Sequence, residues 1–198
     1  MMRMFRRIWN PKILPWLIIV TLSTVFAAKQ FGWMAHIRRS GESAQPGLYS
    51  INHFIDGDTI SVDMNGTPQS IRFIGVDTPE THKPNTPVQC YGPQAAAFTK
   101  QMIGSGRVRL VADSGSDSRD IYGRLVRYVY LPDGRNLDEL LIQNGYGFAY
   151  TYYPFTLAAH FAADQQSAQA SGKGLWGACK PYQETGGRWQ TQPATSEK

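Results

Sequence analysis

Short runs of alternating apolar and polar residues dominate the chain between residues 48 and 131. The run TISVDM (59–64) places Ile60, Val62 and Met64 on one face, the period of a half-buried strand. The Asn65-Gly66 pair that follows is typical of a tight hairpin turn. By the same criteria the sequence predicts five strands, over residues 48–55, 59–64, 68–76, 107–112 and 123–131.

Three longer segments have the composition and stop signals of helices. They cover residues 91–103, 136–145 and 155–172, and each runs up to a glycine that would end it. Five strands, a helix after the third and two helices at the end favour a closed barrel with helices outside. The predicted fold is therefore mainly β with α (α+β), a five-stranded OB-fold β-barrel with three packed helices.

The two ends of the chain differ in composition from the middle. A basic flank precedes the uncharged apolar stretch ILPWLIIVTLSTVFAA, so we read residues 1–28 as a signal peptide or a membrane anchor. Either alternative places the rest outside the cytosol, at the cell surface, in a periplasm or secreted. Residues 29–48 are then a linker, 49–180 the globular domain, and the polar 181–198 a disordered tail.

The net charge and the cysteine count say little about which molecules this protein binds. The formal net charge of the 198 residues is +5, but four basic and no acidic side chains lie within residues 1–28. The rest is nearly neutral, so any attraction for phosphate must come from local placement. Outside the cytosol, the pair Cys90 and Cys179 would usually form a disulfide, with two buried free thiols as the alternative.

Acidic and basic side chains gather at the ends of the predicted strands. Taken singly, each fits an ordinary turn or a solvated strand end. Together they offer oxygen ligands for a hard divalent cation, planar donor forks for phosphate, and a carboxylate that could act as a general base. This combination indicates a phosphodiester-hydrolysing site. The residues are Asp56, Asp58, Asp77, Glu80, Arg72 and Arg124.

Three motifs in order, IDGDT, IRFIGVDTPET and YGRLVRYVY, resemble the staphylococcal nuclease (thermonuclease) family. The resemblance runs from about Ile51 to Trp176. It implies an OB-fold barrel and calcium-dependent cleavage of DNA and RNA, with little sequence preference and with 3′-phosphate products. The alternative is a non-catalytic OB-fold module that binds nucleic acid or protein, tethered at the membrane by the N-terminal segment. We expect a monomer.

The resemblance also implies roles for individual residues. Asp58 and Asp77, with the carbonyl of Thr78, resemble the ligands of Ca²⁺. Asp56 aligns with a carboxylate that lies near the ion without ligating it. Glu80 aligns with the proposed general base. The catalytic arginines of the family, which hold the phosphate and stabilise its developing charge, align with Arg72 and Arg124.

We expect aromatic and basic side chains to bind the substrate. Tyr122, Tyr150 and Tyr152 match tyrosines of the family's nucleotide pocket, with core packing as the alternative for the last two. The loop that contains Lys83 has fewer cationic side chains than that of the best-known secreted family member. We therefore expect this protein to bind polynucleotides more weakly than that member, and with greater sensitivity to salt. A Cys90–Cys179 bridge resembles family variants that tie the C-terminus to the active-site loop. The spacing of His160 and the other histidines predicts no metal site.

Overall fold

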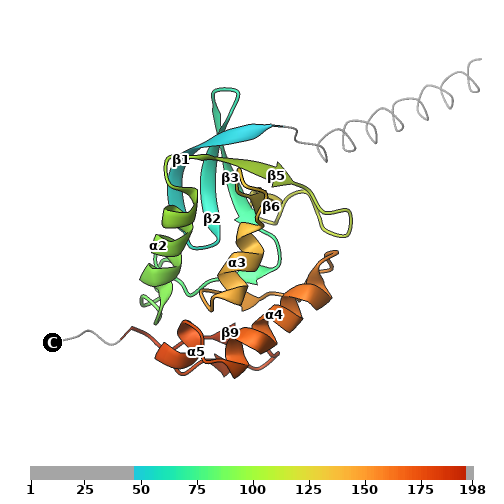
Figure 1. The fold of residues 1–198 in the computed structure, drawn as a ribbon. Helices are drawn as coiled ribbons and strands as arrows, with labels where there is room; N and C mark the ends of the chain where they lie inside the picture. Colours follow the sequence, from blue (N-terminus) through green and yellow to red (C-terminus); the bar gives the residue numbers. More distant parts are fainter. Residues whose placement is uncertain (1–46, 195–198) are drawn as a thin grey trace, which may run out of the picture. The chain divides into compact units, whose positions relative to one another are not determined.

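The computed structural model describes residues 47–194, which are built around a closed five-stranded barrel (Figure 1). The neighbour order is β1-β2-β3-β6-β5, and β1 pairs with β5 to close the barrel. Strands β3 and β6 run parallel, and the other barrel pairs run antiparallel. This confirms the predicted α+β OB-fold. The strands are β1 (Leu48–Asp56), β2 (Thr59–Met64), β3 (Thr67–Phe73), β5 (Arg107–Val111) and β6 (Leu125–Tyr130).

The barrel interior is filled by the apolar positions that the alternation predicted. Ile60 and Val62 have no exposed surface, and Asp63 between Val62 and the turn faces solvent. The Asn65-Gly66 turn joins β2 to β3, and both residues have positive φ, 55° and 81°. Such a turn matches the twist of the two strands, which explains why this dipeptide occurs there.

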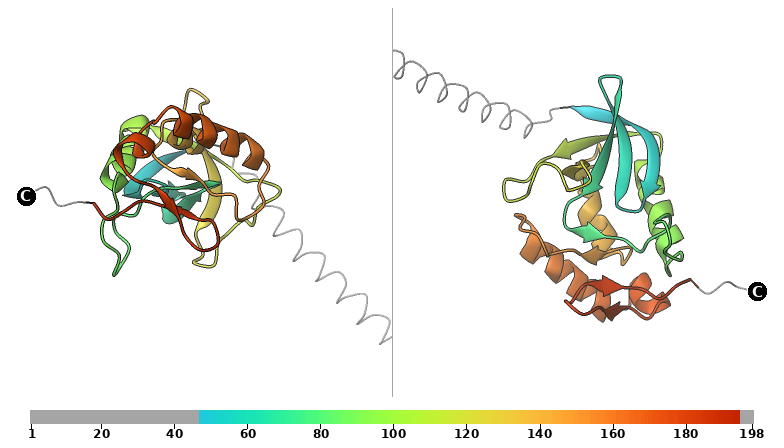
Figure 2. Two further views of the ribbon diagram at one scale, coloured as in Figure 1. Left: turned by 90° about the horizontal axis from the view of Figure 1, so that it is seen from below. Right: turned by 180° about the vertical axis from the view of Figure 1, so that it is seen from behind.

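Four described helices pack beside and below the barrel (Figures 1 and 2). Helix α2 (Gly92–Ile103), α3 (Leu137–Gln143) and α4 (Ala158–Ala170) are the three expected ones, and α5 (Leu175–Ala178) is a short addition. Leu137 and Leu141 are fully buried because α3 contacts both β6 and α4. Asn136 caps α3 by accepting hydrogen bonds from two amides of its first turn.

The strand expected over residues 68–76 is broken at Gly75. This residue has φ +68°, and a Cβ there would overlap the ring of Phe155, so only glycine fits. The chain then forms the two-residue strand β4 (Val76–Asp77), which pairs with β7 (Phe148–Ala149). The Tyr150 amide donates a 2.8 Å hydrogen bond to the Gly75 carbonyl. The break places Asp77 beside β7 and Tyr150.

The disordered tail expected over residues 181–198 is wrong for residues 181–194. This segment forms a hairpin of β8 (Tyr182–Gln183) and β9 (Trp189–Gln190). The Trp189 ring stacks on Phe148 and meets Trp176 edge to face, and Thr191 is buried. The polar composition concealed this order, in which Trp189 supplies the ring contacts. Residues 195–198 lie outside the described part.

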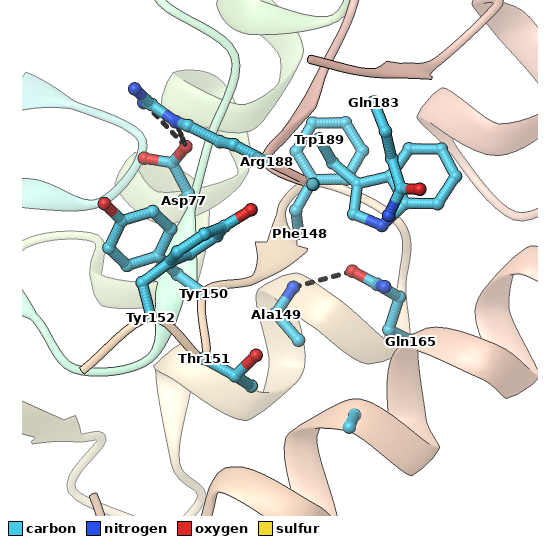
Figure 3. A pocket seen from close by; sticks show the side chains of 12 residues that line it. Asp77, Phe148, Ala149, Tyr150, Thr151, Tyr152, Gln165, Gln183, Arg188 and Trp189 are labelled. Carbon is cyan, nitrogen blue, oxygen red and sulfur yellow. Dashed lines mark hydrogen bonds and ion pairs between the residues drawn. The ribbon is translucent and has the colours of Figure 1, made fainter. Parts of the chain in front are cut away.

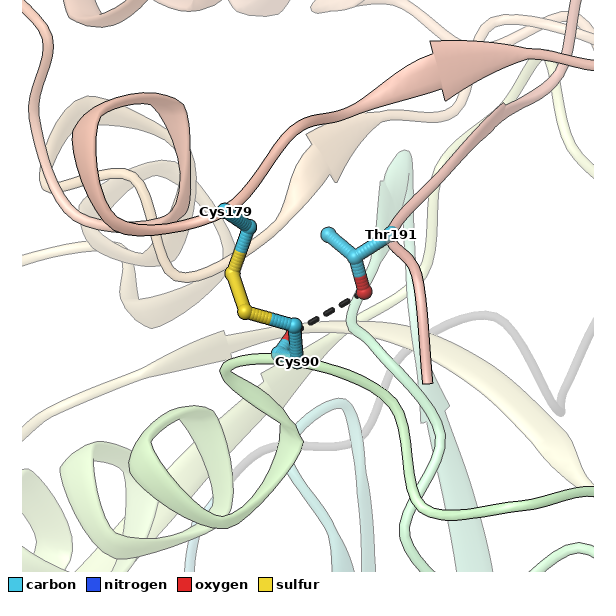
Figure 4. The surroundings of a disulfide bond; sticks show 3 residues. All are labelled: Cys90, Cys179 and Thr191. Atoms are coloured by element: carbon cyan, nitrogen blue, oxygen red, sulfur yellow. Dashed lines mark hydrogen bonds between the residues drawn. A yellow bond between two sulfur atoms is a disulfide. The ribbon is translucent and has the colours of Figure 1, made fainter. Parts of the chain in front are cut away.

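A disulfide joins Cys90, just before α2, to Cys179 at the end of α5, immediately before the C-terminal hairpin (Figure 4). Cys90 and Cys179 are bonded, which confirms the predicted pairing over two free thiols. The hairpin adds to this link, because the Cys90 amide donates to the Gln192 carbonyl at 2.7 Å. The Thr191 hydroxyl also donates to the Cys90 carbonyl at 2.8 Å.

The signal peptide or anchor expected over residues 1–28 lies outside the described residues, as does nearly all of the linker. Between residues 47 and 194, no helix combines the length and apolar character needed to cross a membrane. The membrane association and the extracytoplasmic location therefore remain expectations from the sequence.

Candidate active site

Two carboxylates, one from the turn between β1 and β2 and one from β4, meet at one guanidinium. Arg72 on β3 places Nη1 3.1 Å from Oδ2 of Asp58 and Nη2 3.0 Å from Oδ1 of Asp77. The backbone fixes this arginine further, because Nη1 also donates to the Val76 carbonyl at 2.8 Å. The structure thus brings together three of the predicted site residues around a single positive charge.

Thr78 and Gly57 fix the position of the Asp58 carboxylate in this cluster. The amide and hydroxyl of Thr78 donate to Oδ2 of Asp58 at 2.7 and 3.1 Å. A Cβ on Gly57 would lie 2.8 Å from the Thr78 hydroxyl oxygen, so the absence of a side chain lets the two loops approach. The predicted ligand residues Asp58, Asp77 and Thr78 are therefore neighbours.

Asp56 and Glu80 differ in how they are held. Asp56 is fixed by hydrogen bonds from the Gly57 amide at 2.8 Å and the Thr81 hydroxyl at 2.9 Å. The carboxylate of Glu80 has no hydrogen-bond partner within the described chain, although the Glu80 amide donates to the Gln89 side chain. Burial raises the pKa of Glu80, and the carboxylates of Asp56 and Asp58 raise it further. A free carboxylate with a raised pKa suits proton transfer.

Arg124 is positioned at the start of β6 by a residue that the sequence analysis did not assign. Its Nε donates to Oδ2 of Asp120 at 2.6 Å, and its amide donates to the other carboxylate oxygen at 2.9 Å. The guanidinium also lies 5.4 Å from the ring centre of Tyr122. The Asp-Arg spacing of four across the Gly123 turn is the sequence signal that could have identified Asp120.

All the predicted catalytic and ligand residues line one cleft of about 970 Å³. Lys83, Tyr122 and Tyr150 line it too, whereas Tyr152 does not. Tyr122 is 77% exposed, so it is available to a ligand and plays no part in the core. The predicted substrate-binding tyrosines therefore do not form one group.

Arg188 is a third arginine of the site, and the sequence analysis missed it. It comes from the C-terminal hairpin, and its Nη2 and Nε lie 2.9 and 3.1 Å from Oδ2 of Asp77 (Figure 3). Burial has the largest effect on the pKa of Asp77 and raises it above its ordinary value, although Arg72 and Arg188 both lower this pKa. The signal in the sequence was GGRWQ, a turn followed by a short strand.

A second group of possible metal ligands lies outside the cleft. Side-chain atoms of Glu139, His160 and Asp164 on α3 and α4 lie within 4.8 Å of one another. The His160 Nε2 is 3.0 Å from a Glu139 oxygen and 3.6 Å from an Asp164 oxygen. We interpret this group as an ion pair, because His160 contacts Glu139 on α3 and Asp164 one turn further along α4.

Comparison with known proteins agrees with this geometry. The family model described as "Staphylococcal nuclease homologue" matches residues 70–178. The chain is 39% identical over 174 residues to a thermonuclease of Staphylococcus hyicus, covering 83% of this chain and 98% of the relative. It is 43% identical over 129 residues to endonuclease YncB of Bacillus subtilis, covering 64% of this chain.

The overlap with the Bacillus subtilis relatives is partial. The chain spans 60% of the length of YncB and 43% of the SPbeta prophage-derived endonuclease YokF, to which it is 41% identical. The family match covers more than half of the chain, and the Staphylococcus hyicus relative is matched almost throughout. The chain therefore belongs to the staphylococcal nuclease family.

Proposed function

We propose that this chain is a nuclease that hydrolyses phosphodiester bonds of DNA and RNA, with Ca²⁺ as its cofactor and low sequence specificity. One observation carries the proposal: Asp58, Asp77 and Arg72 are in direct contact, and the free carboxylate of Glu80 lines the same cleft. The relatives named thermonuclease and endonuclease support this assignment.

The residues present fit a hard divalent cation. The carboxylates of Asp58 and Asp77 lie 3.1 and 3.0 Å from one guanidinium, so their oxygens already surround a positive charge. Carboxylate and carbonyl oxygens are the ligands that Ca²⁺ prefers, so Asp58, Asp77 and the Thr78 carbonyl would hold it. When bound, the ion supplies Lewis-acid polarisation of the phosphoryl group.

The cleft residues can carry out the hydrolysis. Glu80 accepts a proton from the attacking water, whose oxygen forms the new bond to phosphorus. Arg72 and Arg124 bind the phosphate oxygens and stabilise the added negative charge. Asp120 orients Arg124 through its 2.6 Å contact. The bond from phosphorus to the 5′ oxygen breaks, that oxygen takes up a proton from solvent and leaves as a hydroxyl, and a 3′-phosphate remains, as the family resemblance implies.

The proposed activity on both DNA and RNA follows from the chemical group that the arginines would bind. The two arginines bind phosphate, which DNA and RNA share and which carries no sequence information.

For the location of the protein we propose a compartment outside the cytosol. The support is the Cys90–Cys179 disulfide, because such bonds persist in oxidising compartments.

A chelation experiment on the full chain tests the cofactor. Hydrolysis of single-stranded DNA should require added Ca²⁺, stop with excess chelator and return when Ca²⁺ is restored. The ends of the products, labelled with and without phosphatase treatment, should carry 3′-phosphates. Hydrolysis that continues in chelator would contradict the assignment of Asp58 and Asp77 as ligands.

A further inference from the structure

Glu80 and Gln89 hold each other at the two ends of the loop formed by residues 81–88. The Gln89 amide donates to the Glu80 carbonyl at 2.9 Å, and the Glu80 amide donates to Oε1 of the Gln89 side chain at 2.8 Å. Residues 82–85 of the loop are exposed, whereas Gln89 is only 8% exposed. Both backbone groups of Glu80 are thus bound by one buried residue.

The position of the Glu80 carboxylate depends on these backbone contacts. This carboxylate accepts no hydrogen bond within residues 47–194, whereas the Asp58 carboxylate is held by the amide and hydroxyl of Thr78. Its oxygens are therefore open to a water molecule, but no side chain fixes them. A shift of the Glu80 backbone would move the carboxylate with it.

The other end of the Gln89 side chain is bound by the C-terminal hairpin. Its Nε2 donates to Oε1 of Gln190 on β9 at 2.7 Å, a contact across 101 positions of the chain. The Glu80 amide can only donate, so it requires the oxygen of the Gln89 amide group on its side and directs the nitrogen toward Gln190. The Gln89 side chain is therefore a bridge between Glu80 and the hairpin.

Further contacts keep the two sides of this bridge together. The Cys90 amide donates to the Gln192 carbonyl at 2.7 Å, and the Ala194 amide donates to the Val88 carbonyl at 2.8 Å. The disulfide from Cys90 to Cys179 adds a covalent link (Figure 4). The residues on both sides of Gln89 are thus fixed to the hairpin.

We propose that Gln89 is a positioning residue for Glu80, and that the C-terminal hairpin sets the place of this general base through Gln190. The proposal rests on the proposed nuclease function. A general base must lie within hydrogen-bond reach of the water that it deprotonates, and a small misplacement lowers the rate steeply. Because Arg72 and Arg124 bind the phosphate, loss of the bridge lowers kcat and leaves KM unchanged.

A double-mutant cycle with Glu80→Gln tests whether Gln89 acts through Glu80. Gln89→Met in the full chain keeps the length of the side chain but lacks its amide. We expect it to lower kcat for single-stranded DNA by about tenfold, with KM unchanged. In the Glu80→Gln background no general base is left to misplace, so the same substitution should cost less than about twofold. Equal losses in both backgrounds, or no loss in either, would overturn the proposal.

Gln190→Met tests the hairpin side of the bridge and leaves Gln89 in place. We expect kcat to fall by about threefold, because Gln89 keeps the bond from the Glu80 amide but loses its second anchor. Gln101→Met is the matched control, since Gln101 is exposed on α2 and does not line the cleft. Wild-type kcat in Gln190→Met would show that the hairpin does not position Glu80.

Hydrogen exchange at the Glu80 amide measures the bridge without hydrolysis. This amide is bonded to the Gln89 side chain, so its exchange should be about tenfold faster in Gln89→Met and also faster in Gln190→Met. A wild-type chain that does not cut DNA would contradict the nuclease proposal, while faster exchange in both variants would still support the bridge. A chain that cuts DNA but shows unchanged exchange in both variants would overturn the positioning role alone.

Discussion

Arg188 lies against Asp77, with its Nη2 2.9 Å from Oδ2 of a carboxylate that lies 111 positions earlier in the chain. The same carboxylate is paired through its other oxygen with Arg72. A residue proposed to ligate a cation is thus held by two guanidinium groups, one from the barrel and one from the C-terminal hairpin. Cation binding at Asp77 has to compete with Arg188.

Removal of the Arg188 charge should therefore strengthen cation binding. We expect Arg188→Gln to lower the dissociation constant for Ca²⁺ by about tenfold, because one positive charge beside a ligand oxygen is lost. Isothermal titration calorimetry without substrate measures this directly. Arg135→Gln is the matched control, since Arg135 pairs with Asp133 and does not line the cleft. Equal affinity in Arg188→Gln and wild type would contradict the competition.

The disulfide should stabilise both the domain and the hairpin. Cys90 and Cys179 are separated by 89 positions. The chain-entropy treatment of a loop of this length gives about 4–5 kcal/mol. We expect the Cys90→Ser/Cys179→Ser double variant to lose a free energy of unfolding of that order in urea denaturation. A loss below about 1 kcal/mol would show that the hairpin contacts at Thr191 and Gln192 hold the segment without the bond.

The ion pair between α3 and α4 should make stability depend on pH. The hydrogen bond to Glu139 and the nearby charge of Asp164 raise the pKa of His160 above its ordinary 6.5. The folded state therefore binds this proton more tightly than the unfolded state. The stabilisation is fully present below pH 6.5 and is lost as pH rises through the raised folded-state pKa.

Thermal unfolding of the wild type and of His160→Gln tests this dependence. We expect the wild type to have the higher Tm at pH 5.5, with the difference disappearing at pH 9. A constant difference across this range would show that the imidazolium charge does not contribute.

Close approach of two loops makes Gly57 sensitive to substitution. Gly57→Ala should displace Thr78, because the new Cβ would meet its hydroxyl oxygen at 2.8 Å. Since Thr78 holds Asp58 through its amide and hydroxyl, we expect Ca²⁺ affinity to fall by roughly tenfold. Gly66→Ala, in the β2–β3 turn outside the cleft, meets no neighbouring atom but is strained by its φ of +81°, so it controls for a general loss of stability without displacement of Thr78. Wild-type affinity in Gly57→Ala would show that the loops can separate without cost.

Local patterns predicted the barrel and the Asp58–Asp77–Arg72 cluster well. Alternation marks strands such as β2, and short motifs at strand ends carry the site. Contacts between residues far apart in the sequence could not be predicted from such patterns. Trp189 orders the hairpin by packing on Phe148 and Trp176, and nothing near Trp189 in the sequence indicates those partners. Arg188 was missed for this reason.

In the proposed calcium-dependent hydrolysis, Glu80 removes a proton from the attacking water. The most direct measurement is the rate of cleavage of single-stranded DNA at saturating Ca²⁺ by the full chain and by Glu80→Gln, with circular dichroism to confirm equal folding. We predict a fall in kcat of about 10²–10⁴-fold, the usual contribution of a general base. A Glu80→Gln rate within a few-fold of the wild type would show that Glu80 is not the general base.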